Sequence, residues 1–146
     1  MHRAASLPAA IILFGCGILP GELPEWVANR QPLASCGSEV LEQGESHDEE
    51  ARLCLLEAYL AGRGAELIST EPTVEGDPIT TFIRVHENGV IEVFVDATRD
   101  RFGSGRWERI GCQDLVPVEE ANDPPDVVFT PDMVFIQEGC EELPVP

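Results

Sequence analysis

Hydrophobic positions follow three different patterns along the 146-residue chain. The first nineteen residues hold one apolar run, residues 46–62 repeat leucines at a spacing of three or four, and residues 65–118 alternate short apolar runs with turn residues. The leucine spacing predicts an amphipathic helix, and the short runs predict strands that are buried on one face. The pattern therefore predicts a small domain of mixed secondary structure behind an apolar leader.

The helix is predicted over residues 46–62. Ser46 is a candidate N-cap, and Glu49 three residues later completes a capping box. Gly62 is a natural stop residue. Three leucines share one face at helical spacing and are expected to pack on a sheet, namely Leu53, Leu56 and Leu60. The same face is widened by Ala51, Cys54, Leu55, Ala58 and Tyr59.

The pair Asn88-Gly89 predicts a hairpin between two alternating strands. A two-residue turn would place Val85 opposite Glu92 and mix polar with apolar side chains on one face. A loop over residues 87–89 instead gives one coherent apolar face, which favours this register because one face must be buried. The register pairs Val85 with Ile91, Ile83 with Val93 and Thr81 with Val95 on one face, and Phe82 with Phe94 and Arg84 with Glu92 on the other.

The other strands are predicted to be short. Residues 65–70 and 106–110 are strand-like, and residues 112–118 extend the second of them. Residues 119–126 predict a linker, and the apolar runs within 127–136 predict edge strands or an extended wrap. The predicted fold is α+β, with one amphipathic helix packed on an antiparallel sheet of about four strands.

The apolar leader is typical of an export signal. Arg3 precedes an apolar run over residues 9–19, which is shorter than the ~20 residues that cross a membrane. Leu13-Phe14-Gly15-Cys16 resembles a lipoprotein cleavage box, which would place lipid on Cys16. The string Leu33-Ala34-Ser35-Cys36 matches such a box on its own but lacks the preceding apolar run. The alternative is an amphipathic or disordered N-terminus on a cytosolic protein.

This interpretation divides the chain into a signal peptide over residues 1–15, a tether over 16–35 and a single domain over 36–146. The domain ends in an extended segment over 119–146. We expect the protein to be exported and anchored to the cell envelope by lipid, or otherwise to be secreted or periplasmic.

Five cysteines occur, an awkward number for a secreted protein. Lipid on Cys16 leaves four, which allow three pairings. We prefer the two pairs that close local loops, Cys36 with Cys54 and Cys112 with Cys140. A cysteine metal site is disfavoured because no Cys-x-x-Cys occurs. Free thiols remain the alternative if the protein is cytosolic.

Charge narrows the possible partners. The chain has 9 basic and 27 acidic residues, a net charge of −18, and no lysine. A field of this sign repels nucleic-acid phosphates and anionic headgroups. We therefore expect no nucleic-acid binding and no membrane contact except through a lipid anchor. A cationic partner, either a protein or a polymer at the envelope, is permitted.

The loop over residues 96–104 holds the candidate chemistry. Asp96, Thr98 and Asp100 alternate as calcium ligands do, but an EF-hand needs glycine and glutamate where this chain has Arg101 and Trp107. A calcium site of another kind remains open. The structural alternative is that the aspartates bond turn amides and pair with Arg101 or Arg99.

Other catalytic signals are weak. Asp77 and Asp96 are a possible acid–base pair, and His47 and His86 are both expected to be exposed. We expect no cofactor and no metal, and no catalytic motif is found. The candidate interaction loop comprises Asp77, Asp96, Asp100 and Arg101.

Two segments together resemble a family of small bacterial lipoproteins whose domain has no assigned function. The segments are Glu75-Gly76-Asp77-Pro78-Ile79 and Asp96-Ala97-Thr98-Arg99-Asp100-Arg101-Phe102-Gly103, and a cysteine follows at position 112. The resemblance spans about residues 45–115 and implies an exported bacterial domain without implying an activity. Three functions therefore stay open: an anchored, non-enzymatic interaction domain, a small calcium- or cation-binding module on the 96–104 loop, or a hydrolase using Asp77 and Asp96.

Overall fold

A computed structural model describes residues 23–118 and 134–146. The elements in chain order are α1 (Glu25–Ala28), β1 (Ala34–Val40), α2 (Glu49–Leu60), β2 (Ala65–Pro72), β3 (Pro78–Val85), β4 (Ile91–Asp96), β5 (Trp107–Cys112), β6 (Asp114–Pro117), β7 (Phe135–Glu138) and β8 (Glu141–Leu143). The predicted signal peptide, Cys16, the predicted linker over 119–126 and the run over 127–129 lie outside the described residues.

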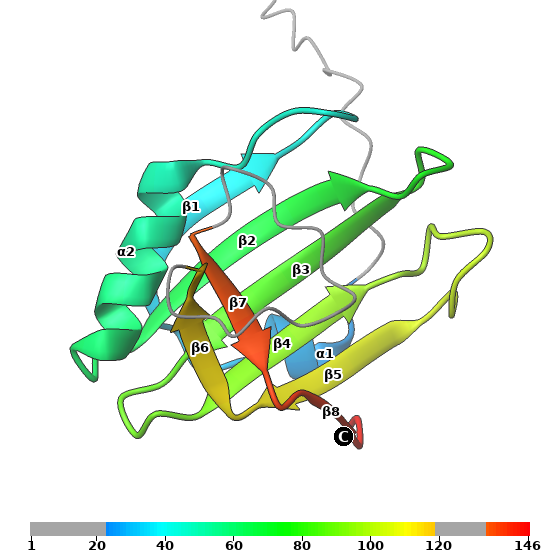
Figure 1. The fold of residues 1–146 in the computed structure, drawn as a ribbon. Helices are drawn as coiled ribbons and strands as arrows, with labels where there is room; N and C mark the ends of the chain where they lie inside the picture. Colours follow the sequence, from blue (N-terminus) through cyan, green and yellow to red (C-terminus); the bar gives the residue numbers. More distant parts are fainter. Residues whose placement is uncertain (1–22, 119–133) are drawn as a thin grey trace, which may run out of the picture.

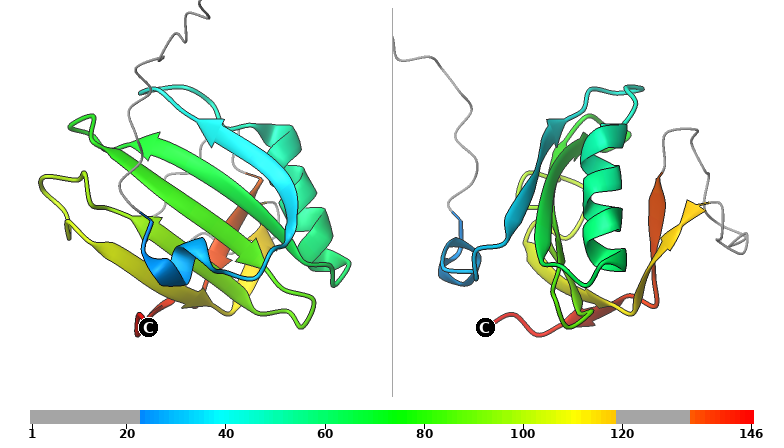
Figure 2. Two further views of the ribbon diagram at one scale, coloured as in Figure 1. Left: turned by 180° about the vertical axis from the view of Figure 1, so that it is seen from behind. Right: turned by 90° about the vertical axis from the view of Figure 1, so that its left-hand side faces the viewer.

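The strands form one large mixed sheet and one small sheet. The large sheet has six strands in the order β1-β2-β3-β4-β5-β8, and β6 pairs with β7 separately. Helix α2 and the β6–β7 pair lie over one face of the large sheet, and α1 lies on the opposite face (Figures 1 and 2).

The predicted fold class is wrong, since the structure is mostly sheet, with six strands in the main sheet rather than about four and a second short helix. The sheet is also mixed, because β1 runs parallel to β2 and is joined to it through α2. Strand β1 has the sequence Ala-Ser-Cys-Gly-Ser-Glu-Val, with no run of large apolar residues, and only its Glu39 is buried. Such a strand has no hydrophobic alternation to reveal it in a sequence.

Helix α2 begins later than predicted, and its predicted apolar face is buried on the side of Leu55 and Leu56 but not on the side of Leu53 and Leu60. Its N-cap is Asp48, not Ser46, and the Asp48 carboxylate accepts a hydrogen bond from the backbone N–H of Ala51. Leu53 and Leu60 are 40% and 66% exposed. The buried positions are Ala51, Arg52, Leu55, Leu56 and Ala58. The rotation brings Arg52 against Glu39 and Cys54 against Cys36, two contacts that leucine spacing does not encode.

The hairpin between β3 and β4 has the predicted register. Val85 pairs with Ile91, Phe82 with Phe94 and Arg84 with Glu92. Gly89 has a φ of 81° and donates its N–H to the carbonyl of His86. The prediction of a loop over residues 87–89 is confirmed, because the register that separates apolar from polar faces is the one the chain adopts.

The apolar core lies between the sheet and α2. Leu55 and Leu67 are fully buried there, together with Leu115 of β6 and Phe135 of β7. Within residues 112–118, Cys112 ends β5, and Asp114–Pro117 form a separate strand that closes this core instead of extending β5.

A smaller cluster occupies the opposite face. Val27 of α1 is fully buried against Phe82 and Phe94, and the ring of Trp26 meets Phe94 edge-on at 5.0 Å. Residues 25–28, part of the segment expected to be a tether, are thus folded onto the sheet. The contact is made by two adjacent apolar side chains, Trp26 and Val27.

Two disulfides cross-link the fold, one near its N-terminal end and one near its C-terminal end. Cys36 of β1 is bonded to Cys54 of α2, and Cys112 at the end of β5 is bonded to Cys140 before β8. The prediction of disulfides is confirmed, and the pairs are those preferred from the sequence. Their loops of 18 and 28 residues correspond to about 3–4 kcal/mol each in the chain-entropy model. These bonds fit an oxidising location.

No helix within residues 23–118 and 134–146 has the length and apolar character needed to cross a membrane.

Candidate functional site

The structure joins two members of the predicted interaction loop. Asp77, in the turn before β3, accepts hydrogen bonds from the backbone N–H of Arg101 at 3.1 Å and from its Nε at 3.0 Å. These bonds hold the pKa of the Asp77 carboxyl below its ordinary value. The pair ties the β4–β5 loop to the β2–β3 turn, as the structural alternative expects.

The other two aspartates close local turns. Asp96 Oδ1 accepts from the N–H and the hydroxyl of Thr98 at 3.0 and 2.6 Å. Asp100 Oδ1 accepts from the N–H groups of Phe102 and Gly103, each at 2.9 Å. The carboxylates of the loop thus serve its own amides, and no observation favours a calcium site or an acid–base pair there.

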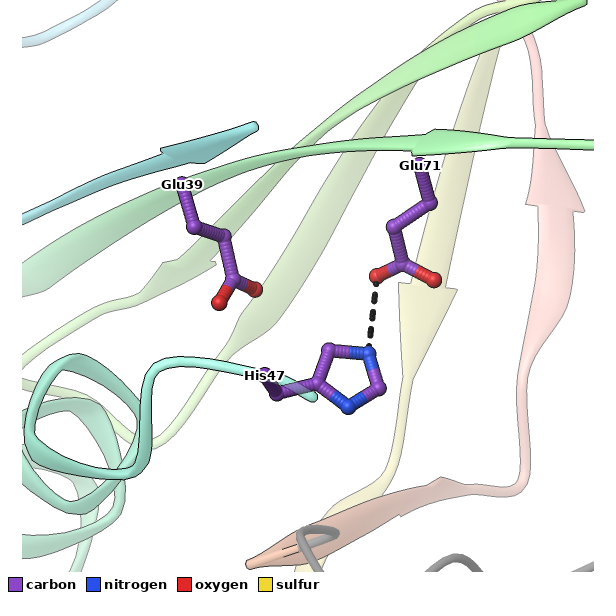
Figure 3. Close-up of side chains that lie close together, drawn as sticks. All are labelled: Glu39, His47 and Glu71. Atoms are coloured by element: carbon purple, nitrogen blue, oxygen red, sulfur yellow. Dashed lines mark hydrogen bonds and ion pairs between the residues drawn. The ribbon is translucent and has the colours of Figure 1, made fainter. Parts of the chain in front are cut away.

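One cluster within the described residues has the composition of a metal site. Glu39 of β1, His47 before α2 and Glu71 of β2 offer ligand atoms within 4.8 Å of one another (Figure 3). His47 Nε2 lies 3.2 Å from Glu71 Oε1, and its side chain is 16% exposed. The expectation that His47 is exposed is therefore wrong, because the loop before α2 turns it toward β2.

A guanidinium already supplies the positive charge in this cluster. Arg52 Nη2 lies 2.6 Å from Glu39 Oε1 and 3.1 Å from Glu71 Oε1. The Ser69 hydroxyl reaches the same two oxygens at 2.8 and 2.9 Å. A metal bound to both carboxylates would have to displace the arginine, so the residues fit an ion cluster better than a metal centre.

The pKa of Glu39 reflects this arrangement. Burial opposes ionisation of the carboxyl, but hydrogen bonds from the Asp48 N–H, Ser69 and Arg52 outweigh it and lower the pKa. The cluster therefore joins β1, β2 and the first turns of α2. Sequence reasoning missed it because Glu39 lies in a stretch without a pattern and Arg52 looks like a polar helix residue.

A second charged network crosses the opposite face of the sheet. Arg84 of β3 is 2% exposed and lies between Glu66 of β2 at 2.9 Å and Glu92 of β4 at 3.0 Å. Glu66 also binds Arg30 at 2.7 Å, and Glu92 also binds Arg109 of β5 at 2.6 Å. Three arginines thus share two glutamates, a net charge of 3 − 2 = +1 in a chain of −18.

The ion pairs of this network shift the pKa values of its members. Burial opposes ionisation of Glu66, but hydrogen bonds and attraction from Arg30 and Arg84 lower its pKa. The same pairing raises the pKa of Arg30. His86 Nε2 lies 3.5 Å from Glu92, and its side chain is 19% exposed, so the expectation that His86 is exposed is also wrong.

A small open pocket lies against this network. Its volume is about 230 Å³ and its lining is Trp26, Arg30, Gln31, Arg84, His86, Glu92, Phe94, Arg109 and Pro146. The hairpin register places Arg84 beside Glu92, and α1 brings Trp26 over Phe94. The pairing of Arg84 with Glu92 could be predicted from the sequence, but the contribution of α1 to the pocket could not.

The exposed side of α2 has the opposite character. A wide groove of about 650 Å³ there is lined by Asp48, Glu49, Glu50, Leu53, Cys54 and Glu57. It contains four carboxylates and no basic residue. This surface therefore carries four of the 27 acidic residues of the chain.

No protein-family model, curated protein or solved structure matches this chain.

Proposed function

We propose that this protein is an exported envelope protein, held at a membrane by lipid on Cys16, whose folded part is a non-enzymatic binding domain. The cysteine pairing carries the proposal. Of five cysteines, four are joined in two disulfides, which leaves Cys16 without a cysteine to pair with in the chain. Lipid attachment accounts for that odd cysteine, and both the apolar leader and the resemblance to small bacterial lipoproteins agree with it.

The experiment is fractionation of the full chain expressed in bacteria, with intact-mass measurement of the mature protein. We expect a mature chain that begins at Cys16, carries lipid and fractionates with membranes. The Cys16→Ser variant should lose both the lipid and the membrane association. An unprocessed protein in the cytoplasm, with all five thiols titrating, would contradict the proposal.

A matched control tests the second cleavage box. The double variant Cys36→Ser/Cys54→Ser removes the cysteine of that box together with its disulfide partner, so no new free thiol appears. It should keep its lipid and its membrane association. Loss of both in this variant would assign the lipid to Cys36 instead.

For the partner of the domain, we propose a cationic protein or polymer that lies along α2. The support is the acidic groove, whose four carboxylates have no basic neighbour in the lining. Attraction between such a groove and a polycation weakens steeply as the ionic strength rises, because exposed charges are screened within about 10 Å at 0.1 M salt.

Binding of an oligolysine peptide at low salt tests this partner. A triple glutamine variant of the groove, at Glu49, Glu50 and Glu57, should weaken binding more than a control with the same change in net charge. The control takes exposed glutamates that do not line the groove, namely Glu75, Glu87 and Glu141. Equal weakening by both variants would mean that only net charge matters and would contradict a site on α2.

A further inference from the structure

The arginine pocket, lined by Trp26, Arg84 and Arg109 among others, has a charge opposite to that of the molecule. Three of the nine arginines of the chain converge there on two glutamates. Each glutamate already bridges two guanidiniums, since Glu66 binds Arg30 and Arg84, and Glu92 binds Arg84 and Arg109. One positive charge therefore remains without a carboxylate of its own.

Hydrogen-bond capacity also remains at the guanidiniums. An arginine carries five N–H donors. Arg84 uses one N–H for Glu66, one for Glu92 and one for the carbonyl of Gln31. Arg109 uses two for Glu92 and one, at 3.4 Å, for the carbonyl of Pro144. These two side chains therefore have more N–H donors than the protein offers them acceptors.

The remaining walls of the pocket are aromatic. Trp26 and Phe94 meet edge-on with their ring centres 5.0 Å apart, and the guanidinium of Arg84 lies 5.2 Å from the centre of the Phe94 ring. Guanidiniums held against aromatic rings form a surface that accepts a planar group as well as a negative charge.

Volume limits the size of a ligand. The pocket measures about 230 Å³, whereas sites for drug-sized molecules occupy about 300–1,000 Å³. A protein segment or a sugar chain could enter only with its tip. A small molecule with one charged end and a compact body is the better fit.

We propose that the arginine pocket binds a small organic anion, a carboxylate attached to a planar or apolar body. The carboxylate pairs with the spare donors of Arg84 and Arg109, because a guanidinium presents parallel N–H groups that match two carboxylate oxygens. The body lies against Trp26 and Phe94. This site goes beyond the proposed function: it is separate from the acidic groove on α2 and does not depend on lipid at Cys16.

The test is a titration of the full chain with benzoate, followed by tryptophan fluorescence and by calorimetry. Trp26 lines the pocket, so its emission should change on binding. Benzoate should bind more tightly than acetate, which lacks the body, and benzyl alcohol, which lacks the charge, should not bind. No response to benzoate at millimolar concentration would overturn the proposal, as would equal affinity for inorganic phosphate.

Two matched variants separate the pocket from general charge. Arg109→Gln should weaken benzoate binding at least tenfold, because hydrogen bonds between charged groups contribute about 1.5–3 kcal/mol. Arg106→Gln makes the same change at an arginine that pairs with Glu142 and does not line the pocket, so affinity should not change. Equal weakening by both variants would overturn the proposal.

A second measurement uses the wild-type chain, so its result does not depend on whether a variant folds. In the wild-type chain, benzoate should shift the NMR signals of Trp26, Phe94 and Arg109. The signals of β1, at the far edge of the sheet, should stay in place. Shifts confined to α2 or β1 would place binding elsewhere and overturn the proposal.

Discussion

Asp48 is the residue that starts α2. Its Oδ1 accepts the N–H of Ala51 at 3.0 Å, whereas no cap bond involves the predicted N-cap Ser46. Loss of an N-cap costs about 0.5–2 kcal/mol. We expect Asp48→Ala to lower the free energy of unfolding in urea by about 1 kcal/mol and Ser46→Ala to change it by less than about 0.5 kcal/mol. An equal effect of the two variants would contradict the observed cap.

Arg52 is the cation of a buried ion cluster. Its side chain is 8% exposed and that of Glu39 is 4% exposed. Removing one partner of a buried pair costs about 3–5 kcal/mol, whereas an exposed pair contributes about 0–1 kcal/mol. We expect Arg52→Met to destabilise the fold by several kcal/mol and Arg106→Met, at an exposed pair, by less than about 1 kcal/mol.

A double variant checks the cause. Arg52→Met/Glu39→Met removes both buried charges and should be more stable than Arg52→Met alone, since the cost comes from the unpaired carboxylate. If the double variant is the less stable of the two, packing rather than charge explains the role of Arg52. Urea unfolding measures all of these variants.

At the scale of the element, α2 buries only part of the apolar face that its sequence predicts. Leu55 is fully buried and Leu53 is 40% exposed. Leucine-to-alanine changes in a core cost about 2–5 kcal/mol. We expect Leu55→Ala to lose an amount in this range and Leu53→Ala to lose less than about 1 kcal/mol. The reverse order in urea unfolding would contradict the observed rotation of the helix.

The register of the hairpin was predictable and the rotation of α2 within its broad apolar face was not, for a physical reason. In a hairpin, a shift of one residue moves every side chain to the other face, so the apolar pattern around Asn88-Gly89 determines the register. A helix can rotate by a fraction of a turn at lower cost, and α2 has apolar residues at Leu53, Leu55 and Leu56. Its rotation depends on Arg52, whose partners lie in β1 and β2, and on Cys54, whose partner lies in β1.

The same reasoning explains which parts of the arginine pocket and of the Arg52 cluster could be predicted from the sequence. The pair of Arg84 with Glu92 follows from the hairpin register alone. Arg30, Trp26 and Glu39 come from segments without periodicity, and they reach their partners only through the tertiary fold. The hairpin part of the arginine pocket was therefore implicit in the sequence, and the parts contributed by α1, by the residues after it and by β5 were not.

At the scale of the whole molecule, pH acts in two opposite directions. A net charge of −18 destabilises the compact state by self-repulsion, which weakens as the pH falls toward the pI of about 4.2. The lowered pKa values of Glu39 and Glu66 mean that their stabilisation is complete above their unfolded pKa and is lost as the pH falls through their folded pKa.

We therefore expect a maximum of stability near pH 5 and a decline below about pH 4.3, the ordinary pKa of glutamate. Urea unfolding between pH 7 and pH 3 measures it. The variant Arg52→Met/Glu39→Met lacks one of the paired carboxylates and should decline less steeply. Stability that keeps rising down to pH 3 would mean that relief of self-repulsion outweighs the loss of the buried pairs.

Salt separates the same two contributions. The Debye length falls from about 30 Å at 0.01 M to about 3 Å at 1 M, which screens exposed charges strongly and buried pairs much less. At pH 7 we expect added NaCl to raise the melting temperature, because self-repulsion between exposed carboxylates is the larger screened interaction. Near the pI of about 4.2 the net charge is close to zero, and the same salt should produce no rise in the melting temperature.

Choline chloride should reproduce the effect of NaCl at pH 7, since screening depends on ionic strength and not on the cation. A melting temperature that falls with salt at pH 7 would show instead that the arginine–glutamate networks contribute more to stability than the excess of negative charge removes.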